Sequence, residues 1–150
     1  MTTTATTDRW RGIMLGLALL GLADASYLTW LKFAHATCGV GGCDVVNSSP
    51  YAELFGVPIA LFGALTYLAI LGLLWMEPRL DATRATYARY AVFGITLFGV
   101  LYSAYLTYVE LAIIKAICPF CVVSAVTLLF LWVLAMIRVL QAEPEEVDMP

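Results

Sequence analysis

Long apolar runs, separated by short polar stretches, dominate the pattern along the chain. Four of the runs reach about 20 residues, the length that a helix needs to cross the hydrocarbon core of a bilayer. They cover approximately residues 12–33, 57–76, 88–114 and 119–139. A loop rich in glycine, asparagine and serine follows the first run, and Pro78 and Asp81 interrupt the chain after the second. We therefore predict an all-α integral membrane protein, a four-transmembrane-helix bundle that forms a single domain over residues 1–150.

The composition agrees with a surface that faces lipid. Hydrophobic residues make up 62% of the chain and charged residues 13%, whereas soluble domains carry roughly 25% charged residues. The first apolar run is too long for the core of a cleaved signal peptide, so we expect it to remain as a span. Basic residues form no patch of the kind that binds nucleic acid, and we expect membrane lipid as the surrounding medium.

Basic residues are distributed unevenly between the two predicted sides of the bundle. One side carries Arg9, Arg11, Arg79, Arg84, Arg89 and Arg138, and the other carries Lys32 and Lys115. By the positive-inside rule, both termini face the cytoplasm, and the loop of residues 37–56 and the link of residues 115–117 are extracytoplasmic. In either orientation two spans separate that loop from that link. Both therefore lie on one side of the membrane, and all four cysteines lie with them.

Two of these cysteines open the fourth predicted span, in the motif Cys118-Pro119-Phe120-Cys121. Proline suits the first position of a helix, so Cys118 falls near the N-cap and Cys121 one turn inside on the same face. Unpaired N–H groups and the helix dipole stabilise a thiolate at this position. The motif therefore predicts a reversible dithiol–disulfide pair.

The other two cysteines, Cys38 and Cys43, lie in the outer loop with three glycines between them. The glycines let the chain fold back for a disulfide and keep the pair mobile enough to reach the membrane surface. Two other interpretations stay open. The cysteines could form two static disulfides, or all four could bind zinc or copper in a metal-binding membrane carrier, although the four residues between Cys38 and Cys43 make only a marginal zinc spacing.

The cysteines, a serine pair and the approach to the second span together resemble the vitamin K epoxide reductase family, in its prokaryotic branch. The residues that carry the resemblance are Cys38, Cys43, Ser48-Ser49, the stretch of residues 55–63, and Cys118-Pro119-Phe120-Cys121. The resemblance covers approximately residues 21–129. It implies a four-helix bundle around a quinone in a prokaryotic cell membrane, with the chain acting as a quinone-dependent disulfide oxidoreductase.

The resemblance also implies a role for each cysteine. Cys38 meets a thioredoxin-like partner, Cys43 exchanges with Cys118, and Cys121 faces the quinone, with Ser49 near the quinone head. Electrons then flow from the partner to the quinone and drive disulfide formation in exported proteins. Many prokaryotic members carry a fused thioredoxin-like domain. We expect none in this sequence, so the partner acts in trans.

Two departures from the animal enzymes bear on the electron acceptor. These enzymes have a tyrosine where this chain has Ala125, and an asparagine where it has Ile59. We therefore expect a respiratory quinone of the ubiquinone or menaquinone type. The bacterial disulfide-bond protein B type also has four spans and two cysteine pairs. It places its CxxC motif in the first outer loop, whereas here the motif opens the last helix.

A few further residues are candidates for supporting roles. Asp24 lies within the first span. Its carboxylate either has a functional role, such as proton transfer near the outer face, or forms a structural hydrogen bond to another helix. His35 lies near Cys38 and could lower the pKa of a thiol or be merely solvated. Phe62 and Phe120 flank the inferred quinone site and are candidate contacts. Glu110 lies near the outer end of the third span, and we expect it at the membrane interface.

Overall fold

The computed structural model describes the backbone of residues 2–147 and the side chains of residues 6–142. Four long helices and a compact loop region make up this part of the chain. In order, the elements are α1 (Thr2–Phe33), α2 (Cys43–Asn47), η1 (Pro50–Ala52), β1 (Glu53–Leu54), β2 (Val57–Pro58), α3 (Ile59–Met76), η2 (Glu77–Arg79), α4 (Ala82–Tyr108), η3 (Val109–Ile114) and α5 (Pro119–Val147).

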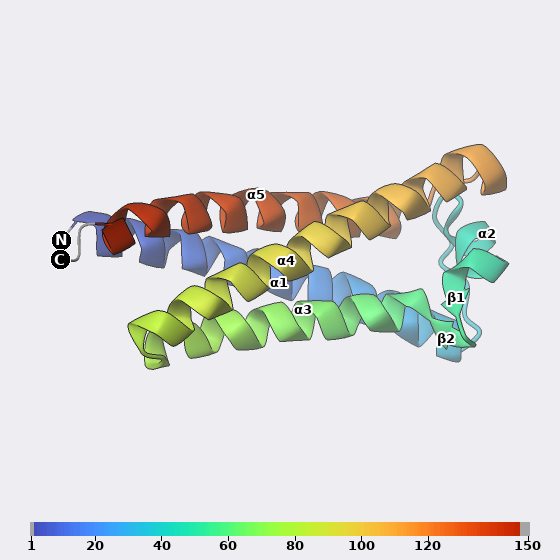
Figure 1. Ribbon diagram of the computed structural model, residues 1–150. Coiled ribbons are helices and arrows are strands. Elements are labelled where there is room, and N and C mark those ends of the chain that lie inside the picture. Colours follow the sequence, from blue (N-terminus) through green and yellow to red (C-terminus); the bar gives the residue numbers. More distant parts are fainter. Residues whose placement is uncertain (1, 148–150) are drawn as a thin grey trace.

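The long helices form an elongated bundle, in which α4 crosses the others obliquely (Figure 1). Helix α1 packs against α3 and α5, and α4 packs against α5 and α3. Helix α1 begins and α5 ends at one end of the bundle, while α2, β1 and β2 lie at the opposite end. The loop with Cys38 and Cys43 therefore lies at the end opposite the start of α1 and the end of α5.

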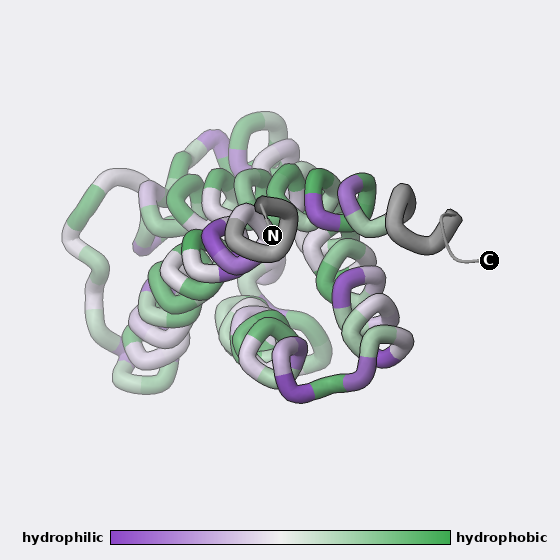
Figure 2. Tube along the Cα trace, turned by 90° about the vertical axis from the view of Figure 1, so that its left-hand side faces the viewer, coloured by the Kyte–Doolittle hydropathy of each residue, from purple (hydrophilic) through white to green (hydrophobic). Residues whose placement is uncertain are grey.

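The side chains on the outside of the bundle are mostly apolar. Phe98 is 70% exposed and Trp75 is 65% exposed, and apolar residues of every long helix share this exposure. Hydrophilic residues gather at the end of the bundle where α1 begins (Figure 2). In the described residues, four helices are long and apolar enough to cross a membrane: residues 6–33, 59–79, 82–114 and 119–142. The predicted four-helix membrane bundle is thus confirmed.

The structure shifts some predicted boundaries. The second span begins at Ile59 rather than at residue 57, because Val57 and Pro58 pair with Glu53 and Leu54 as an antiparallel hairpin. The third begins at Ala82 rather than at residue 88, because Asp81 precedes a polar but fully helical first turn. The sequence pattern missed both shifts because it follows hydropathy, whereas backbone hydrogen bonds decide where a helix begins.

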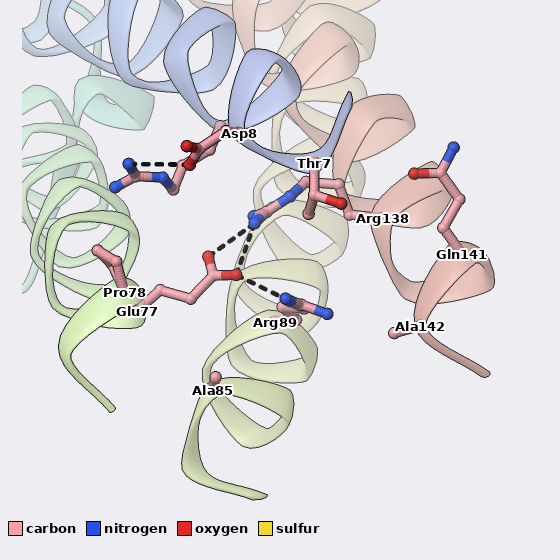
Figure 3. Close-up of a pocket in the computed structure, with 10 residues that line it drawn as sticks. Thr7, Asp8, Glu77, Pro78, Ala85, Arg89, Arg138, Gln141 and Ala142 are labelled. Carbon is pink, nitrogen blue, oxygen red and sulfur yellow. Dashed lines mark hydrogen bonds and ion pairs between the residues drawn. The ribbon is translucent and has the colours of Figure 1, made fainter. Parts of the chain in front are cut away.

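Ion pairs tie three helices together at the end remote from the cysteines (Figure 3). The carboxylate of Glu77 accepts hydrogen bonds from Arg138 Nη2 at 2.6 and 2.8 Å, and from Arg89 Nε at 2.8 Å. Glu77 is only 6% exposed and Arg138 only 2%. Because the three residues come from η2, α4 and α5, the cluster fixes these elements relative to one another beside a cavity of about 260 Å³.

Candidate active site

The loop between α1 and β1 carries a disulfide between Cys38 and Cys43, with their Cα atoms 5.9 Å apart. The Asp44 carboxylate organises this loop, because it accepts the N–H of Cys38 at 2.6 Å and the N–H of Gly39 at 3.3 Å. Cys43 is fully buried, whereas Cys38 is 9% exposed. Of the two sulfur-bearing residues, only Cys38 presents surface to the outside.

Glycine lets this loop approach the start of α5 closely. The N–H of Gly42 donates to the carbonyl of Ile117 at 2.9 Å. A Cβ atom on Gly42 would lie 2.8 Å from the Cβ of Ala116 and 2.9 Å from the Ile117 backbone, closer than real Cβ atoms come. Only glycine therefore fits there, and the contact brings Cys43 into the same buried cluster as Cys118.

The second pair, Cys118 and Cys121, is reduced. Helix α5 begins at Pro119, and the N–H of Val122 donates to the carbonyl of Cys118 at 3.1 Å, as predicted for an N-cap position. The Cys121 thiol donates a hydrogen bond to the Cys118 sulfur, and the Cys121 N–H lies 3.4 Å from it. These donors lower the pKa of the Cys118 thiol, although burial opposes them.

A buried carboxylate adjoins this pair. Glu110 is 5% exposed, and its Oε2 accepts the N–H of Cys118 at 3.2 Å. The Cys121 thiol has one proton, and this carboxylate is the alternative to the Cys118 sulfur as its acceptor. Glu110 belongs to the π-helical turn η3, which ends at the left-handed residue Lys115. Its position at the membrane interface stays a prediction, whereas its burial beside the cysteines was not predicted.

The cysteine pair lies in the wall of a cavity of about 780 Å³ between the helices. Most of the lining is apolar, and the predicted residues Asp24, Ser49, Phe62, Cys118 and Cys121 all contribute to it. Deeper in the bundle the lining becomes polar. There the hydroxyl of Tyr67 lies 2.9 Å from the hydroxyl of Ser124, and Asp24 Oδ2 is buried without a hydrogen-bond partner in the described part of the chain.

Two predicted residues lie outside this wall. His35 is exposed, with a left-handed backbone (φ 50°), and does not line the cavity. Phe120 does not line it either, since its ring packs against Tyr27 with centroids 5.2 Å apart. A redox role for His35 and a quinone contact for Phe120 stay predictions. Among the described residues, no group of three or more His, Cys, Asp or Glu side chains is arranged to hold a metal ion.

Sequence reasoning missed three residues of the site. Asp44 could have been found, because an aspartate next to a loop cysteine often accepts nearby backbone N–H groups. Tyr67 and Ser124 carried no usable signal, because polar residues of this size are common within spans and only the folded bundle brings the Tyr67 hydroxyl of α3 to Ser124 of α5.

Comparison with known proteins gives a consistent result. A family model described as the vitamin K epoxide reductase family matches residues 12–136. The chain is also 33% identical over 115 residues to the thiol-disulfide oxidoreductase LTO1 of Arabidopsis thaliana. That alignment covers 69% of this chain and 30% of the relative, so the chain spans less than a third of the relative's length. The resemblance seen in the cysteines and their surroundings is confirmed.

Proposed function

The chain belongs to the vitamin K epoxide reductase family, and from this premise we propose that it is a membrane thiol–disulfide oxidoreductase. Electrons pass from a thioredoxin-like partner through Cys38–Cys43 and Cys118–Cys121 to a quinone, which drives disulfide formation in exported proteins. One observation carries the proposal. A disulfide-bonded pair and a reduced pair share a buried cluster at the wall of a largely apolar cavity.

Exposure supports Cys38 as the point of entry. A partner's thiolate attacks the sulfur it can reach, and Cys38 presents surface whereas Cys43 does not. Cys43 then leaves as a thiolate inside the cluster that contains Cys118. The relative LTO1 is named a thiol-disulfide oxidoreductase, which is the same chemistry.

The close docking of the loop supports transfer between the pairs. When Cys118 and Cys121 are joined as a disulfide, the Cys43 thiolate attacks Cys118, and Cys121 leaves as a thiolate on the cavity side. The partner's second thiol then releases Cys38 as a thiolate, and Cys38 attacks Cys43 in the Cys43–Cys118 disulfide and releases Cys118 as a thiolate. The lowered pKa of the Cys118 thiol favours this release, because a more stable thiolate is a better leaving group.

The cavity supports a lipid-soluble electron acceptor. Its volume of about 780 Å³ falls within the range of small-molecule sites, which is about 300–1,000 Å³, and its lining is mostly apolar. Ser49 and Phe62 line it together with both cysteines of the second pair. We propose a quinone of the ubiquinone or menaquinone type, with Ser49 and Phe62 among its contacts.

The excess of arginine at the end remote from the cysteines supports the proposed orientation. By the positive-inside rule that end, with both chain termini, lies in the cytoplasm of a prokaryotic cell, and the cysteines lie outside. Exported proteins fold on that side, so a disulfide-forming relay there meets its substrates.

The test is quinone reduction by the purified protein in detergent. A reduced thioredoxin-like protein and a soluble quinone analogue are supplied, and quinone absorbance is followed for the wild type and the variants Cys121→Ala and Cys38→Ala. We expect the wild type to form quinol and Cys121→Ala to form none. We expect Cys38→Ala to work with a small dithiol that can enter at Cys118, but not with the protein partner.

Two outcomes would contradict the proposal. If the wild type reduces no quinone, the relay has another acceptor or none. If the purified wild type binds zinc or copper stoichiometrically, and each cysteine variant loses it, a metal-binding carrier explains the four cysteines better.

A further inference from the structure

Among the glutamates whose side chains the structure describes, Glu110 is the one that is buried beside reacting sulfur atoms. Its carboxylate accepts the N–H of Cys118, is an alternative acceptor for the proton of the Cys121 thiol, and lines the same cavity as both cysteines. It therefore touches the pair and the space proposed for the quinone at the same time.

No ion pair joins Glu110 to a basic side chain in the part of the chain that the structure describes. Burying a carboxylate without a cation is costly, and an ionisable residue within a membrane span marks function by default. The π-helical turn η3 that directs Glu110 inward is itself a rare feature, found frequently at functional sites. Both observations distinguish Glu110 from a carboxylate that merely stabilises the fold.

The chemistry at the pair requires a proton carrier. Oxidation of Cys118 and Cys121 to a disulfide releases two electrons, and a quinone that accepts them also takes up two protons. Cys118 can give up its proton early, because its thiol has a lowered pKa. The Cys121 thiolate that leaves during disulfide exchange takes up a proton and becomes a thiol, the form in which the reduced pair is seen. That proton has to leave sulfur when the disulfide forms again, inside a largely apolar cavity.

We infer that Glu110 is a catalytic residue that accepts the Cys121 proton and returns it to the reduced quinone. The S–S bond forms between the Cys118 thiolate and Cys121, two electrons pass to the quinone, and the proton of Cys121 moves to the Glu110 carboxylate. Glu110 then protonates one quinone oxygen, and one proton from water at the outer face completes the quinol. The inference rests on the function proposed above.

A purely structural role makes a different prediction. Glu110 could serve only to cap α5 by accepting the Cys118 N–H. Glutamine keeps an acceptor oxygen at that position but cannot carry a proton at neutral pH, so Glu110→Gln separates the two roles. Glu53→Gln is the matched control, because Glu53 lies in β1 at the same end of the bundle but is half-exposed and paired with Lys32 at 3.1 Å.

The experiment measures two steps on each variant in detergent. The first is reduction of the Cys118–Cys121 disulfide by a small dithiol without quinone, and the second is quinone reduction by the dithiol form. We expect Glu110→Gln to keep the first step and to slow the second by about 100-fold, since a general acid–base group contributes about 100- to 10,000-fold. Glu53→Gln should match the wild type in both.

A second variant keeps the inference falsifiable if glutamine disturbs the site. Glu110→Asp retains a carboxylate on a shorter chain, and we expect it to reduce quinone faster than Glu110→Gln. If Asp and Gln variants are equally slow, or if Glu110→Gln reduces quinone at the wild-type rate, Glu110 carries no proton and the inference is wrong. A wild type that reduces no quinone would instead remove the proposed function itself, so the two failures are distinguishable.

Discussion

The two ends of the bundle each bury a glutamate, and they treat it in opposite ways. Glu77 is 6% exposed and receives hydrogen bonds from Arg89 and Arg138, so its charge is matched within 3 Å. Glu110 is 5% exposed, and in the described part of the chain its side chain meets the Cys118 N–H and the Cys121 thiol but no cation. Burial alone therefore does not distinguish a structural carboxylate from a functional one.

The surroundings of each glutamate explain the difference. Glu77 joins η2, α4 and α5 next to a cavity of about 260 Å³, whereas Glu110 opens on a cavity of about 780 Å³. A paired carboxylate holds helices together, because separating it from its cations would leave charges buried. A carboxylate that pairs with no cation can take up a proton without leaving an opposite charge buried and unpaired. The end with paired charges should thus govern stability, and the end with cysteines should govern activity.

Removal of the Glu77 charge should have the largest effect on stability. Glu77→Gln leaves Arg138 buried without a counter-ion, and breaking a buried pair in this way costs about 3–5 kcal/mol. The measurement is unfolding in mixed micelles of a mild and a denaturing detergent. The double variant Glu77→Gln with Arg138→Met should recover part of the loss. A Glu110→Gln variant as unstable as Glu77→Gln would refute the division between the two ends.

The substitution Gly42→Ala should have the next largest effect, in this case on the rate of disulfide exchange. Gly42→Ala forces the loop away from Ile117, and a displacement of about 1 Å can slow a reaction by about 100-fold. We expect disulfide exchange between the two cysteine pairs to slow by that factor, while quinone reduction by a small dithiol that enters at Cys118 persists. Gly39→Asn is the control, because a Cβ atom there meets nothing within 4 Å and asparagine tolerates the left-handed backbone. If Gly42→Ala and Gly39→Asn exchange disulfides at equal rates, the close contact between the loop and Ile117 is not needed for the exchange.

Some features of the two ends could be predicted from the sequence. Apolar runs predicted the four helices, because twenty consecutive apolar residues can satisfy their backbone in lipid only as a helix. The motif at Cys118 predicted that α5 begins there with Cys118 near the N-cap, because proline suits the first position of a helix. These features follow from local sequence.

Features that depend on long-range packing were missed. The sequence around Glu110 does not predict a π-helical turn, so it gave no indication that the Glu110 side chain is buried. The pairing of Glu77 with Arg138 joins positions 61 residues apart, and the Tyr67–Ser124 contact joins positions 57 apart. Hydropathy patterns carry no information about such pairs.

The substitution Gly21→Ala should have a smaller effect, on the stability of the packed region around Tyr67. A Cβ atom on Gly21 would overlap the ring of Tyr67, which is fully buried, and overpacking of a core costs about 1–3 kcal/mol. Gly16→Ala is the matched control, because a Cβ atom at Gly16 meets nothing within 4 Å and alanine favours a helix by about 1 kcal/mol. The same detergent unfolding assay should show opposite shifts for the two variants. Equal shifts would mean that the Tyr67 ring moves aside freely.

Removal of the Glu53 charge should have the smallest effect of all. Its carboxylate pairs with Lys32 at 3.1 Å, but the side chain is 44% exposed, and exposed pairs contribute about 0–1 kcal/mol. Lys32 also donates a hydrogen bond to the Asn47 carbonyl at 2.6 Å, so this contact between α1 and the loop remains when Glu53→Gln removes the ion pair. We expect both the unfolding midpoint and quinone reduction to stay near wild type. A large loss of activity without a loss of stability would mean that charge at the loop surface, and not only the buried Glu110, controls electron transfer at this end.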